Sequence, residues 1–364
     1  MVPAIASRIP LVRRPKAPAL PLDERIAHLN GLTVAPASAD HHDLVARASA
    51  VLNYAALIAS DIGMPDLATG LCRKQHEVFA DAGHLTGDIA VMALMPLINI
   101  SRLLTRQGDG EAAYDVLTRL YRAAQKRNTA EIHGNTIDLA SLTSTEADHR
   151  RVCEELWITL LVDGARALAR IGRWTEAAEA LAAHRGIGQR LLDGRQIQIM
   201  ALMERGLDQQ ARDTIDSATP AEPWENTIAA LLRVSCSAPH TSAPETELDL
   251  AMRETLNLTA PRDPSTAVFQ ARVGLTALEL ARDHTNAHRI LPKALADVAA
   301  LDAYAARDVL NHPLTSANLS SDHRNRLQAV LTASGLGAGN LSQDHTHALT
   351  EAVEKAACAL RHLL

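Results

Sequence analysis

The stretch Gly172-Arg-Trp-Thr-Glu-Ala177, with Leu181 four residues further on, decides the expected fold of this 364-residue chain. A glycine directly after a helix supplies the left-handed conformation that ends it, and an alanine early in the next helix lets two backbones approach closely. The stretch therefore predicts a hairpin of two helices. The same spacing recurs at Gly63, Ala68 and Cys72, at Gly108, Ala113 and Leu117, and at Gly206, Ala211 and Ile215. Repeated hairpins bury their apolar sides against one another, as in an α-solenoid.

The interval from Gly172 to Gly206 is 34 residues, which is the period of the tetratricopeptide repeat, or TPR. Gly172-Arg-Trp-Thr-Glu-Ala177 resembles the turn inside that repeat, with an aromatic residue two positions after the glycine and an alanine five positions after it. The family places a small residue seven positions before the glycine. Three of the four turns match, with Ala56, Ser101 and Ala165, whereas the fourth has Ile199.

The other intervals between these glycines, 45 and 64 residues, are irregular, and the family's proline near the repeat end is missing. The resemblance covers residues 42–220 and is to TPR-like proteins with irregular repeats. It implies a helical array that serves as a scaffold, an accessory factor or a peptide-sensing regulator.

Composition agrees with an all-α fold. Alanine and leucine dominate, aromatic residues are few, and runs of β-branched residues are scarce, so helix propensity is high nearly everywhere. We expect three regions: a flexible arm rich in proline and alanine at 1–40, a TPR-like repeat region at 41–236, and a helical region at 237–364 that continues or caps the array. Arginine far outnumbers lysine, which is typical of a high-G+C bacterial genome.

The last helix expected, from about residue 343, carries one continuous apolar stripe. Its members recur at alternating steps of four and three: Leu349, Val353, Ala356, Leu360 and Leu363. A solenoid ends in an atypical unit, so we expect this helix to cap the array. The alternative is the seam of a homodimer.

Several features indicate a cytoplasmic protein. The four cysteines, Cys72, Cys153, Cys236 and Cys358, are widely separated and lack metal-ligand spacing, as expected of free thiols in a reducing compartment. The basic residues near the start are not followed by the apolar stretch of a secretory signal. The longest apolar run, Ile89–Ile98, contains Pro96 and is about half the length of a membrane span. We therefore expect no membrane partner.

Polar residues interrupt the helical pattern between Thr129 and Thr145 and offer the first candidate site. They include Glu131, His133, Asn135, Asp138, Ser141 and Thr143. If the protein is an enzyme, His133 could act as a base oriented by Asp138, with Glu131 nearby. Asn135 would then contribute to ligand binding. The alternative is an ordinary linker, because Thr143 and Glu146 have capping-box spacing before the next helix.

A basic stripe is the second candidate in a chain of net charge −6. Arg119, Arg122 and Lys126 share one face of a predicted helix, and Arg102 and Arg106 lie one turn apart on the helix before it. If both sets face the concave side, they form a trough for an acidic or phosphorylated group or a carboxylate. Solvated helix faces have the same pattern.

Motifs of common enzyme classes and cofactors are missing. His76-Glu77 begins like a zinc HExxH motif, but Ala80 stands where the second histidine is required. His284 and His288 are four residues apart without an evident third ligand, so no metal is expected. Gly186 and Gly188 lack the rest of a nucleotide fingerprint, and no cofactor is expected. Negative charge and scattered tryptophans argue against direct nucleic-acid binding.

Two functions remain open. The first is a non-enzymatic protein that holds a peptide or a partner protein along first helices of successive hairpins. The second is an enzyme, or a subunit of one, that acts on an anionic small molecule or peptide under the 129–145 segment.

Overall fold

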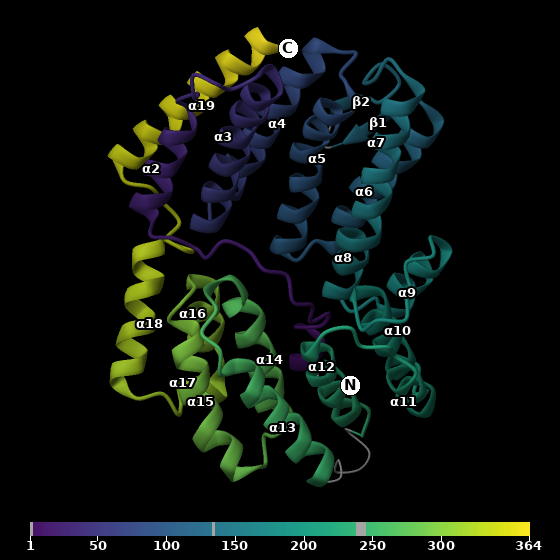
Figure 1. Cartoon of the computed structure of the whole chain (residues 1–364), viewed down its shortest axis with the longest axis vertical. Coiled ribbons are helices and arrows are strands. Elements are labelled where there is room, and N and C mark those ends of the chain that lie inside the picture. Colours follow the sequence, from purple (N-terminus) through teal and green to yellow (C-terminus); the bar gives the residue numbers. More distant parts are fainter. Residues whose placement is uncertain (1–2, 133–134, 238–244) are drawn as a thin grey trace. The chain divides into compact units, whose positions relative to one another are not determined.

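The computed structural model describes residues 3–132, 135–237 and 245–364. The protein is mostly helical, with 73% of the chain in helices and 3% in strands, so the all-α expectation is confirmed. Figure 1 shows the helices along the chain.

The helices fall into two compact units that differ from the expected regions. Unit 2 comprises Leu22–Ala167 and Gly335–Leu364, and unit 1 comprises Met1–Pro21 and Leu168–Ser334. The boundary therefore falls after residue 167 rather than after residue 236. Sequence patterns conceal it because helical structure runs unbroken through this point, from α7 through a π turn at Leu160–Gly164 into α8 (Ala165–Arg170).

Unit 2 is built from consecutive helices that pack side by side. Helix α3 packs on α4, α4 on α5, and α5 on α6, while α7 packs on both α5 and α6. The elements of this unit are α2 (Leu22–Leu32), α3 (His41–Ile62), α4 (Pro65–Ala82), α5 (Gly87–Gln107), α6 (Gly110–Lys126), β1 (Thr129–Ile132), β2 (Asn135–Asp138), α7 (Glu146–Thr159) and α19 (Gln343–Leu363).

Unit 1 has the same sequential packing from α9 through α16. Helix α18 packs on α15 and α16, and the short α1 packs on α14. The elements are α1 (Pro3–Ala6), α9 (Trp174–Ala183), α10 (Asp193–Glu204), α11 (Asp208–Asp216), α12 (Pro223–Ser237), α13 (Glu245–Thr259), the 3-10 turn η2 (Pro264–Thr266), α14 (Ala267–Leu280), α15 (Thr285–Ala299), α16 (Ala303–Leu310), α17 (Pro313–Ser316) and α18 (Ser321–Ser334).

All four glycine turns join two helices as predicted. Their φ angles are 94° at Gly63, 90° at Gly108, 80° at Gly172 and 70° at Gly206. Each glycine donates its N–H to the carbonyl three residues before it, and the next residue donates to the carbonyl five before itself. This is the Schellman arrangement, which satisfies carbonyls left without a partner at a helix end.

The alanines of the four turns are completely buried. Ala68, Ala113, Ala177 and Ala211 are all 0% exposed. The positions seven residues before the glycines are buried too, and at one of them the Ser101 hydroxyl donates to the carbonyl of Ala113 at 2.9 Å. Small side chains therefore let the paired helices pack with their backbones close together.

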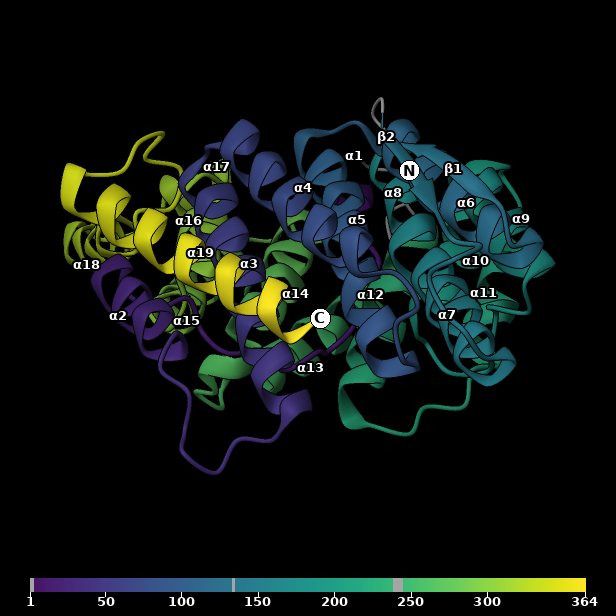
Figure 2. The same cartoon turned by 90° about the horizontal axis from the view of Figure 1, so that it is seen from above.

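Helix α19 does not extend the array from residue 334 onward. It returns to α2, α3 and α4, the first helices of unit 2, as Figures 1 and 2 both show. Leu349, Val353, Ala356 and Leu360 of the predicted stripe are buried in this contact. Because the stripe is already covered within the chain, a homodimer through α19 would have to use another face of the helix.

The connection that leads into α19 closes the end of α3. Gly337 donates its N–H to the carbonyl of Asp61 at 2.9 Å, and Gly339 donates to that of Ile62 at 2.7 Å. These carbonyls lie in the last turn of α3, where no intrahelical donor remains. The glycine-rich stretch is thus a backbone cap for a distant helix.

Residues 1–40 contain more structure than the expected arm. Helix α2 lies within them and buries Ile26 and Leu29 in the core of unit 2. Its sequence begins with Leu22 and two acidic residues and places apolar side chains at helical spacing, a signal that the surrounding prolines obscure.

Among the described helices, α5 alone is long and apolar enough to span a membrane by length and composition, and 61% of the window is buried inside the protein. Helix α5 contacts α3, α4, α6 and α7, which is the position of a core helix.

Candidate functional site

The basic side chains of α5 are held by carboxylates of unit 2. Arg102 donates to Asp163 at 2.8 Å. Arg106 donates to Asp61 Oδ1 at 2.8 Å and to the Ser60 hydroxyl at 2.6 Å. Both arginines are therefore engaged within the unit, although Asp61 also pairs with Arg25 at 2.8 Å.

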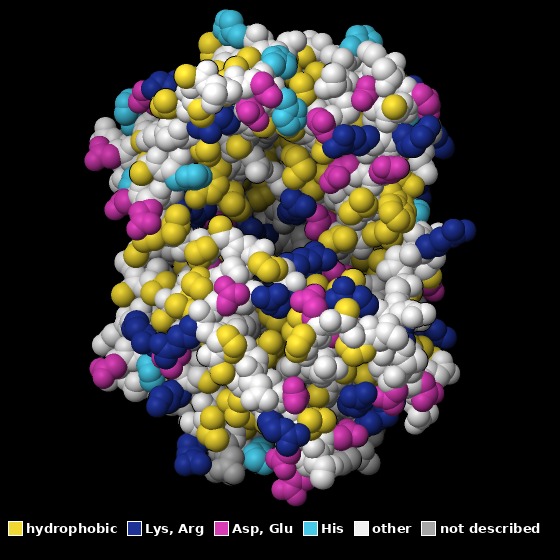
Figure 3. Space-filling model, in the orientation of Figure 1, with side chains coloured by type: hydrophobic (Ala, Val, Ile, Leu, Met, Phe, Trp, Pro, Cys, Tyr) yellow, Lys and Arg dark blue, Asp and Glu magenta, His cyan; other side chains and the backbone are white. Residues whose placement is uncertain are grey.

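The basic side chains of α6 are exposed at the surface. Arg119 pairs with Asp115 at 2.7 Å and lies 3.4 Å from the carbonyl oxygen of Glu131. Arg122 and Lys126 are exposed. Figure 3 shows basic and acidic side chains interspersed over one face of the molecule. This arrangement resembles a solvated surface more than an anion trough.

The 129–145 segment begins with a β-hairpin rather than an irregular loop. Strands β1 and β2 pair antiparallel, with Thr129 opposite Asp138 and Glu131 opposite Thr136. The sequence alternates here, and Ala130, Ile132 and Ile137 are buried while their neighbours are exposed. This two-residue period is the strand signal that the predominance of helix concealed. His133 lies outside the described residues.

Asp138 has a structural role. Its Oδ1 accepts the N–H of Ala140 at 2.8 Å, and its Oδ2 accepts the Ser141 hydroxyl at 2.7 Å. These hydrogen bonds, that of the hydroxyl first, lower the pKa of Asp138. The carboxylate therefore closes the turn after β2. Glu131 accepts the Thr136 hydroxyl across the hairpin, and Asn135 is exposed at the start of β2.

The N-cap of α7 is Thr145, so the expected capping box at Thr143 and Glu146 is wrong. The Thr145 hydroxyl accepts the N–H of Asp148 at 3.1 Å. Thr143 is buried and forms a β-bridge with Leu85 instead. The segment is thus joined to the connection between α4 and α5.

One thiol and imidazole pair lies nearby that the sequence analysis did not single out. Cys153 Sγ is 3.5 Å from His149 Nε2, one turn apart on α7. Burial raises the pKa of the Cys153 thiol and lowers that of His149. Both shifts favour the neutral pair, whereas a nucleophilic cysteine needs a thiolate beside an imidazolium. The spacing of four residues on one helix could have revealed the pair. Its pKa shifts are those of an unreactive packing contact and not of a nucleophile.

Two pockets lie away from the 129–145 segment. One, of about 450 Å³, is in unit 2 and is lined by Leu32, Pro36, Asp43 and Arg47 among others. The second, of about 420 Å³, is in unit 1 beside Leu191, Ile215 and Glu225. Neither is lined by the residues proposed for catalysis.

The second pocket contains a buried carboxylate that is fully engaged. Glu225 is 0% exposed and accepts hydrogen bonds from Arg190 at 2.7 Å and from the N–H groups of Leu191, Ala221 and Glu222. Burial alone would raise the pKa of Glu225, but these hydrogen bonds together lower it. Glu225 therefore holds the start of α12 against the preceding connections.

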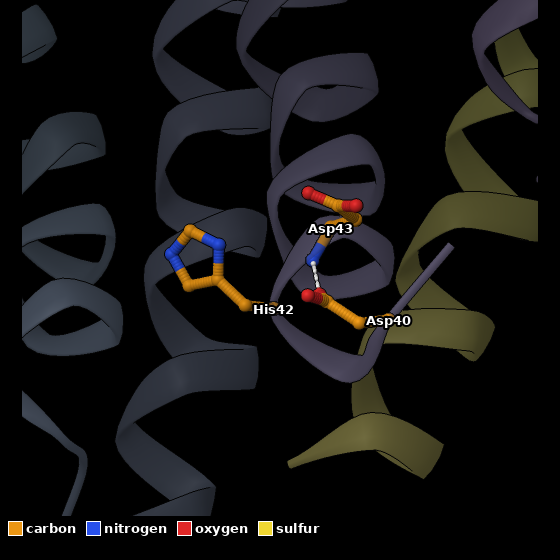
Figure 4. Close-up of side chains that lie close together, drawn as sticks. All are labelled: Asp40, His42 and Asp43. Atoms are coloured by element: carbon orange, nitrogen blue, oxygen red, sulfur yellow. Dashed lines mark hydrogen bonds between the residues drawn. The ribbon is translucent and has the colours of Figure 1, made fainter. Parts of the chain in front are cut away.

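Potential metal ligands meet at the start of α3, where Asp40, His42 and Asp43 each have a ligand atom within 4.8 Å of the others. Figure 4 shows the three side chains around the first turn of this helix. All three are exposed, and Asp40 Oδ1 already accepts the N–H of Asp43 at 2.8 Å as the helix cap. Asp40 is therefore used as the N-cap of α3.

Two of the histidines singled out from the sequence, His76 and His288, have backbone partners, whereas the buried Nδ1 of His284 has none in the described part of the chain. His76 Nδ1 faces the carbonyl oxygen of Ala93 at 3.5 Å, and burial lowers its pKa. His288 Nε2 lies 2.5 Å from the carbonyl oxygen of Arg282. Each of these two imidazoles therefore contacts a backbone carbonyl of its own unit.

A different kind of site occurs in unit 1, where residues 7–19, hereafter segment 7–19, cross the helices. The segment begins with a turn at Ser7 and Arg8 and continues outside any helix or strand. Figure 1 shows it in dark purple passing α12 and α14. Ile9 is 6% exposed and Leu11 is 3% exposed, so both are anchored in the protein. The segment's path is determined by polar contacts as well.

The backbone of Leu11 is clamped by one side chain. Gln196, on α10, accepts the Leu11 N–H at 2.7 Å and donates its amide N–H to the Leu11 carbonyl at 2.8 Å. The same amide nitrogen donates to the carbonyl of Leu191 at 2.7 Å. Gln196 is 0% exposed. A buried amide paired with both backbone groups of one residue recognises extended chain irrespective of its side chain.

Basic side chains of the segment meet acidic residues. Arg14 pairs with Asp193 on α10 at 2.5 Å. Arg13 lies 3.7 Å from Glu222 and 3.7 Å from Asp263, which precede α12 and η2.

Further contacts continue toward α16. The N–H of Lys16 donates to the carbonyl of Ser265 at 3.0 Å, and the Lys16 ammonium lies 4.3 Å from the ring centre of Tyr304. The N–H of Ala19 donates to Asp302 Oδ2 at 3.0 Å. Asp302 Oδ1 accepts the N–H of Tyr304 as the cap of α16, so this residue uses one oxygen for the helix and one for the segment.

The acidic and amide residues that hold the segment are hereafter called the acidic track; they are Asp193, Gln196, Glu222, Asp263 and Asp302. None of them was predicted from the sequence. Their only signal is charge complementarity to the arginines and lysine of residues 8–16. Nothing in the spacing indicates that they meet the segment, and the hydrogen bond between Ala19 and Asp302 joins residues 283 positions apart.

No family model matches the chain, and comparison with curated proteins and with solved structures gives no match.

Proposed function

We propose that this protein is a non-enzymatic, TPR-like helical-repeat protein that binds an extended segment of a partner protein along the first helices of its hairpins. The observation that carries the proposal is segment 7–19 on the acidic track. A helical surface with a built-in extended ligand has the contacts that an extended peptide requires.

The contacts follow the order of the helices. Ser7 accepts a hydrogen bond from Arg170 of α8, Leu11 is clamped from α10, and Arg13 and Lys16 reach the residues just before α12 and α14. The N–H of Ala19 donates to Asp302, which caps α16. These are the first helices of successive pairs. In a helical array such helices present side chains at regular intervals along one surface.

The proposed enzyme site has less support. Asp138 is used to close a turn, the pKa shifts of Cys153 and His149 disfavour a reactive thiolate, and the two pockets described lie elsewhere. A partner-binding role needs no reactive group. It needs the carboxylates, backbone acceptors and apolar anchoring positions that unit 1 supplies.

Peptide-display selection against the full chain, followed by photo-crosslinking of the selected peptides, tests this function. We expect crosslinks on α10, α12, α14 and α16. In a protein whose own segment is weakened by Arg13→Glu/Arg14→Glu, adding Gln196→Ala should weaken peptide binding, because the backbone clamp is lost. Gln209→Ala, at an exposed position of α11, is the matched control. Selected peptides that crosslink elsewhere and bind equally well with and without Gln196→Ala would contradict the proposal.

A further inference from the structure

We propose that segment 7–19 is an internal competitor, and that the acidic track recognises a basic, extended peptide of a partner protein that must displace it. This inference rests on the proposed function and names its ligand class and its regulation.

The charge of the track selects the ligand. Asp193, Glu222 and Asp263 face Arg13 and Arg14, and Tyr304 provides a ring for the Lys16 ammonium. A carboxylate set of this kind favours cations and repels an acidic peptide. An occupant other than segment 7–19 therefore has to be basic at the same places.

The backbone contacts select the conformation. Gln196 takes both polar groups of Leu11, while Ser265 and Asp302 accept the N–H groups of Lys16 and Ala19. Pro15 and Pro18 have no N–H and favour an extended chain. The ligand class is thus an extended peptide with an apolar anchor followed by two or three basic residues.

Apolar burial gives the segment its anchor. Ile9 and Leu11 are nearly inaccessible, whereas Arg14 and Lys16 are exposed to solvent. The basic half can therefore be detached while the anchor keeps the unit intact. A partner's peptide would exchange first at the ionic contacts.

Covalent attachment makes the segment a strong competitor. A tethered ligand is present at an effective concentration in the millimolar range, so a free peptide at micromolar concentration is at a disadvantage. The apparent affinity for a partner is the intrinsic affinity multiplied by the fraction of molecules whose track is open. Weakening the tethered segment should consequently strengthen binding of the same sequence supplied from outside.

The test uses a fluorescent peptide with the sequence of residues 5–20 and the full-length protein. In the variant Arg13→Glu/Arg14→Glu, both reversed charges face the track, and the apolar anchor is retained. We expect the peptide to bind this variant at least ~10-fold more tightly than the wild type. Trypsin should also cleave after Lys16 faster in the variant, which reports release of the segment directly.

Arg119→Glu/Arg122→Glu on α6 is the matched control, because it makes the same charge change on exposed arginines of unit 2. It should bind the peptide as the wild type does. A probe carrying glutamate at both arginine positions should bind none of the proteins. Circular dichroism establishes that each variant is folded.

Equal binding of the peptide to all three proteins would overturn the competition but leave the proposed function standing. Selected neutral peptides that bind the track when the basic probe does not would overturn the ligand class alone. If the folded variant releases its segment yet binds neither probe nor selected peptides, the proposed function itself fails. A wild-type dimer in light scattering that the charge reversal dissociates would identify exchange between two copies and overturn the partner peptide.

Discussion

Glycine at the hairpin turns is required by backbone conformation and not by lack of space. Gly108 has a φ of 90°, and a β-carbon built on it meets no atom within 4 Å. The cost of a side chain there is therefore the strain of a left-handed conformation alone.

We expect Gly108→Ala to lower the free energy of unfolding by roughly 1–2 kcal/mol. Urea denaturation measures the change. Gly188→Ala is the control, because Gly188 also has open space and lacks the positive φ. A loss of equal size in both variants would refute the explanation from backbone strain.

The cysteines should differ in reactivity according to their burial. Burial raises the pKa of Cys72 to about 12 and that of Cys236 to about 11, so their thiolate forms are scarce near neutral pH. Cys358 is exposed. With a thiol-specific chromophore at pH 8 we expect Cys358 to react first and the two buried thiols to react only on unfolding.

Removing the exposed thiol provides the control for this prediction. Cys358→Ser should abolish the fast phase and leave the slow phases unchanged. Rapid labelling of Cys72 in the folded protein would show that α4 is more open than the structure has it.

Structure is best predicted from sequence where a residue type strongly favours one backbone conformation. Gly63 and Gly172 mark helix ends because positive φ is costly for other residues, and the alanine five positions later follows from close packing. The contact of Gln196 with Leu11 has no such signal, because an amide can pair with any backbone group. That is why the turns were predicted and the acidic track was not.

At the scale of elements, α19 shows both the strength and the limit of pattern reading. Its stripe is buried as its periodicity requires, since an apolar face needs a partner. Periodicity does not say which partner, and α19 packs on α3, about 300 residues earlier, instead of on its neighbours in sequence. The hairpin of β1 and β2 was missed for the opposite reason, because four-residue strands are too short to stand out.

Ala352 and Ala359 provide a matched pair on α19. Ala352 is 1% exposed, whereas Ala359, seven residues later, is exposed. We expect Ala352→Asp to destabilise unit 2 by about 3 kcal/mol or more, since it buries an unpaired charge. Ala359→Asp should cost less than about 0.5 kcal/mol. Thermal or denaturant unfolding of both variants checks this.

Light scattering on the same pair separates the two interpretations of the stripe. If the stripe only covers α3, Ala352→Asp changes stability without dissociating any oligomer. A dimer in the wild type that becomes a monomer in this variant would restore the dimer seam as the better account.

On the scale of the whole molecule, stability should depend on pH through buried histidines. His76, His149 and His312 have a lowered pKa, mainly because burial disfavours the charged imidazole. His312 is 5% exposed and lies 3.3 Å from Glu279; nearby Arg8 lowers its pKa further, while Glu279 opposes the shift.

The sign of the pH effect follows from linkage. The unfolded chain takes up these protons at a higher pH than the folded protein, so the stabilisation is present above about pH 6.5 and is lost as the pH falls below it. We expect the melting temperature to drop between pH 7 and pH 5. His312→Gln should reduce that slope, and His347→Gln, at an exposed position, should leave it unchanged. A flat profile in the wild type would contradict the prediction.

The return of α19 to α3 has a consequence for synthesis on the ribosome. The apolar face of α3 emerges early, but the helix that covers it is made roughly 300 residues later, which takes on the order of 15–60 s at ordinary elongation rates. During that delay the nascent chain exposes this apolar surface to other polypeptides. We therefore expect chaperones to bind the nascent chain until α19 has been synthesised. Products truncated before residue 343 should aggregate or be degraded.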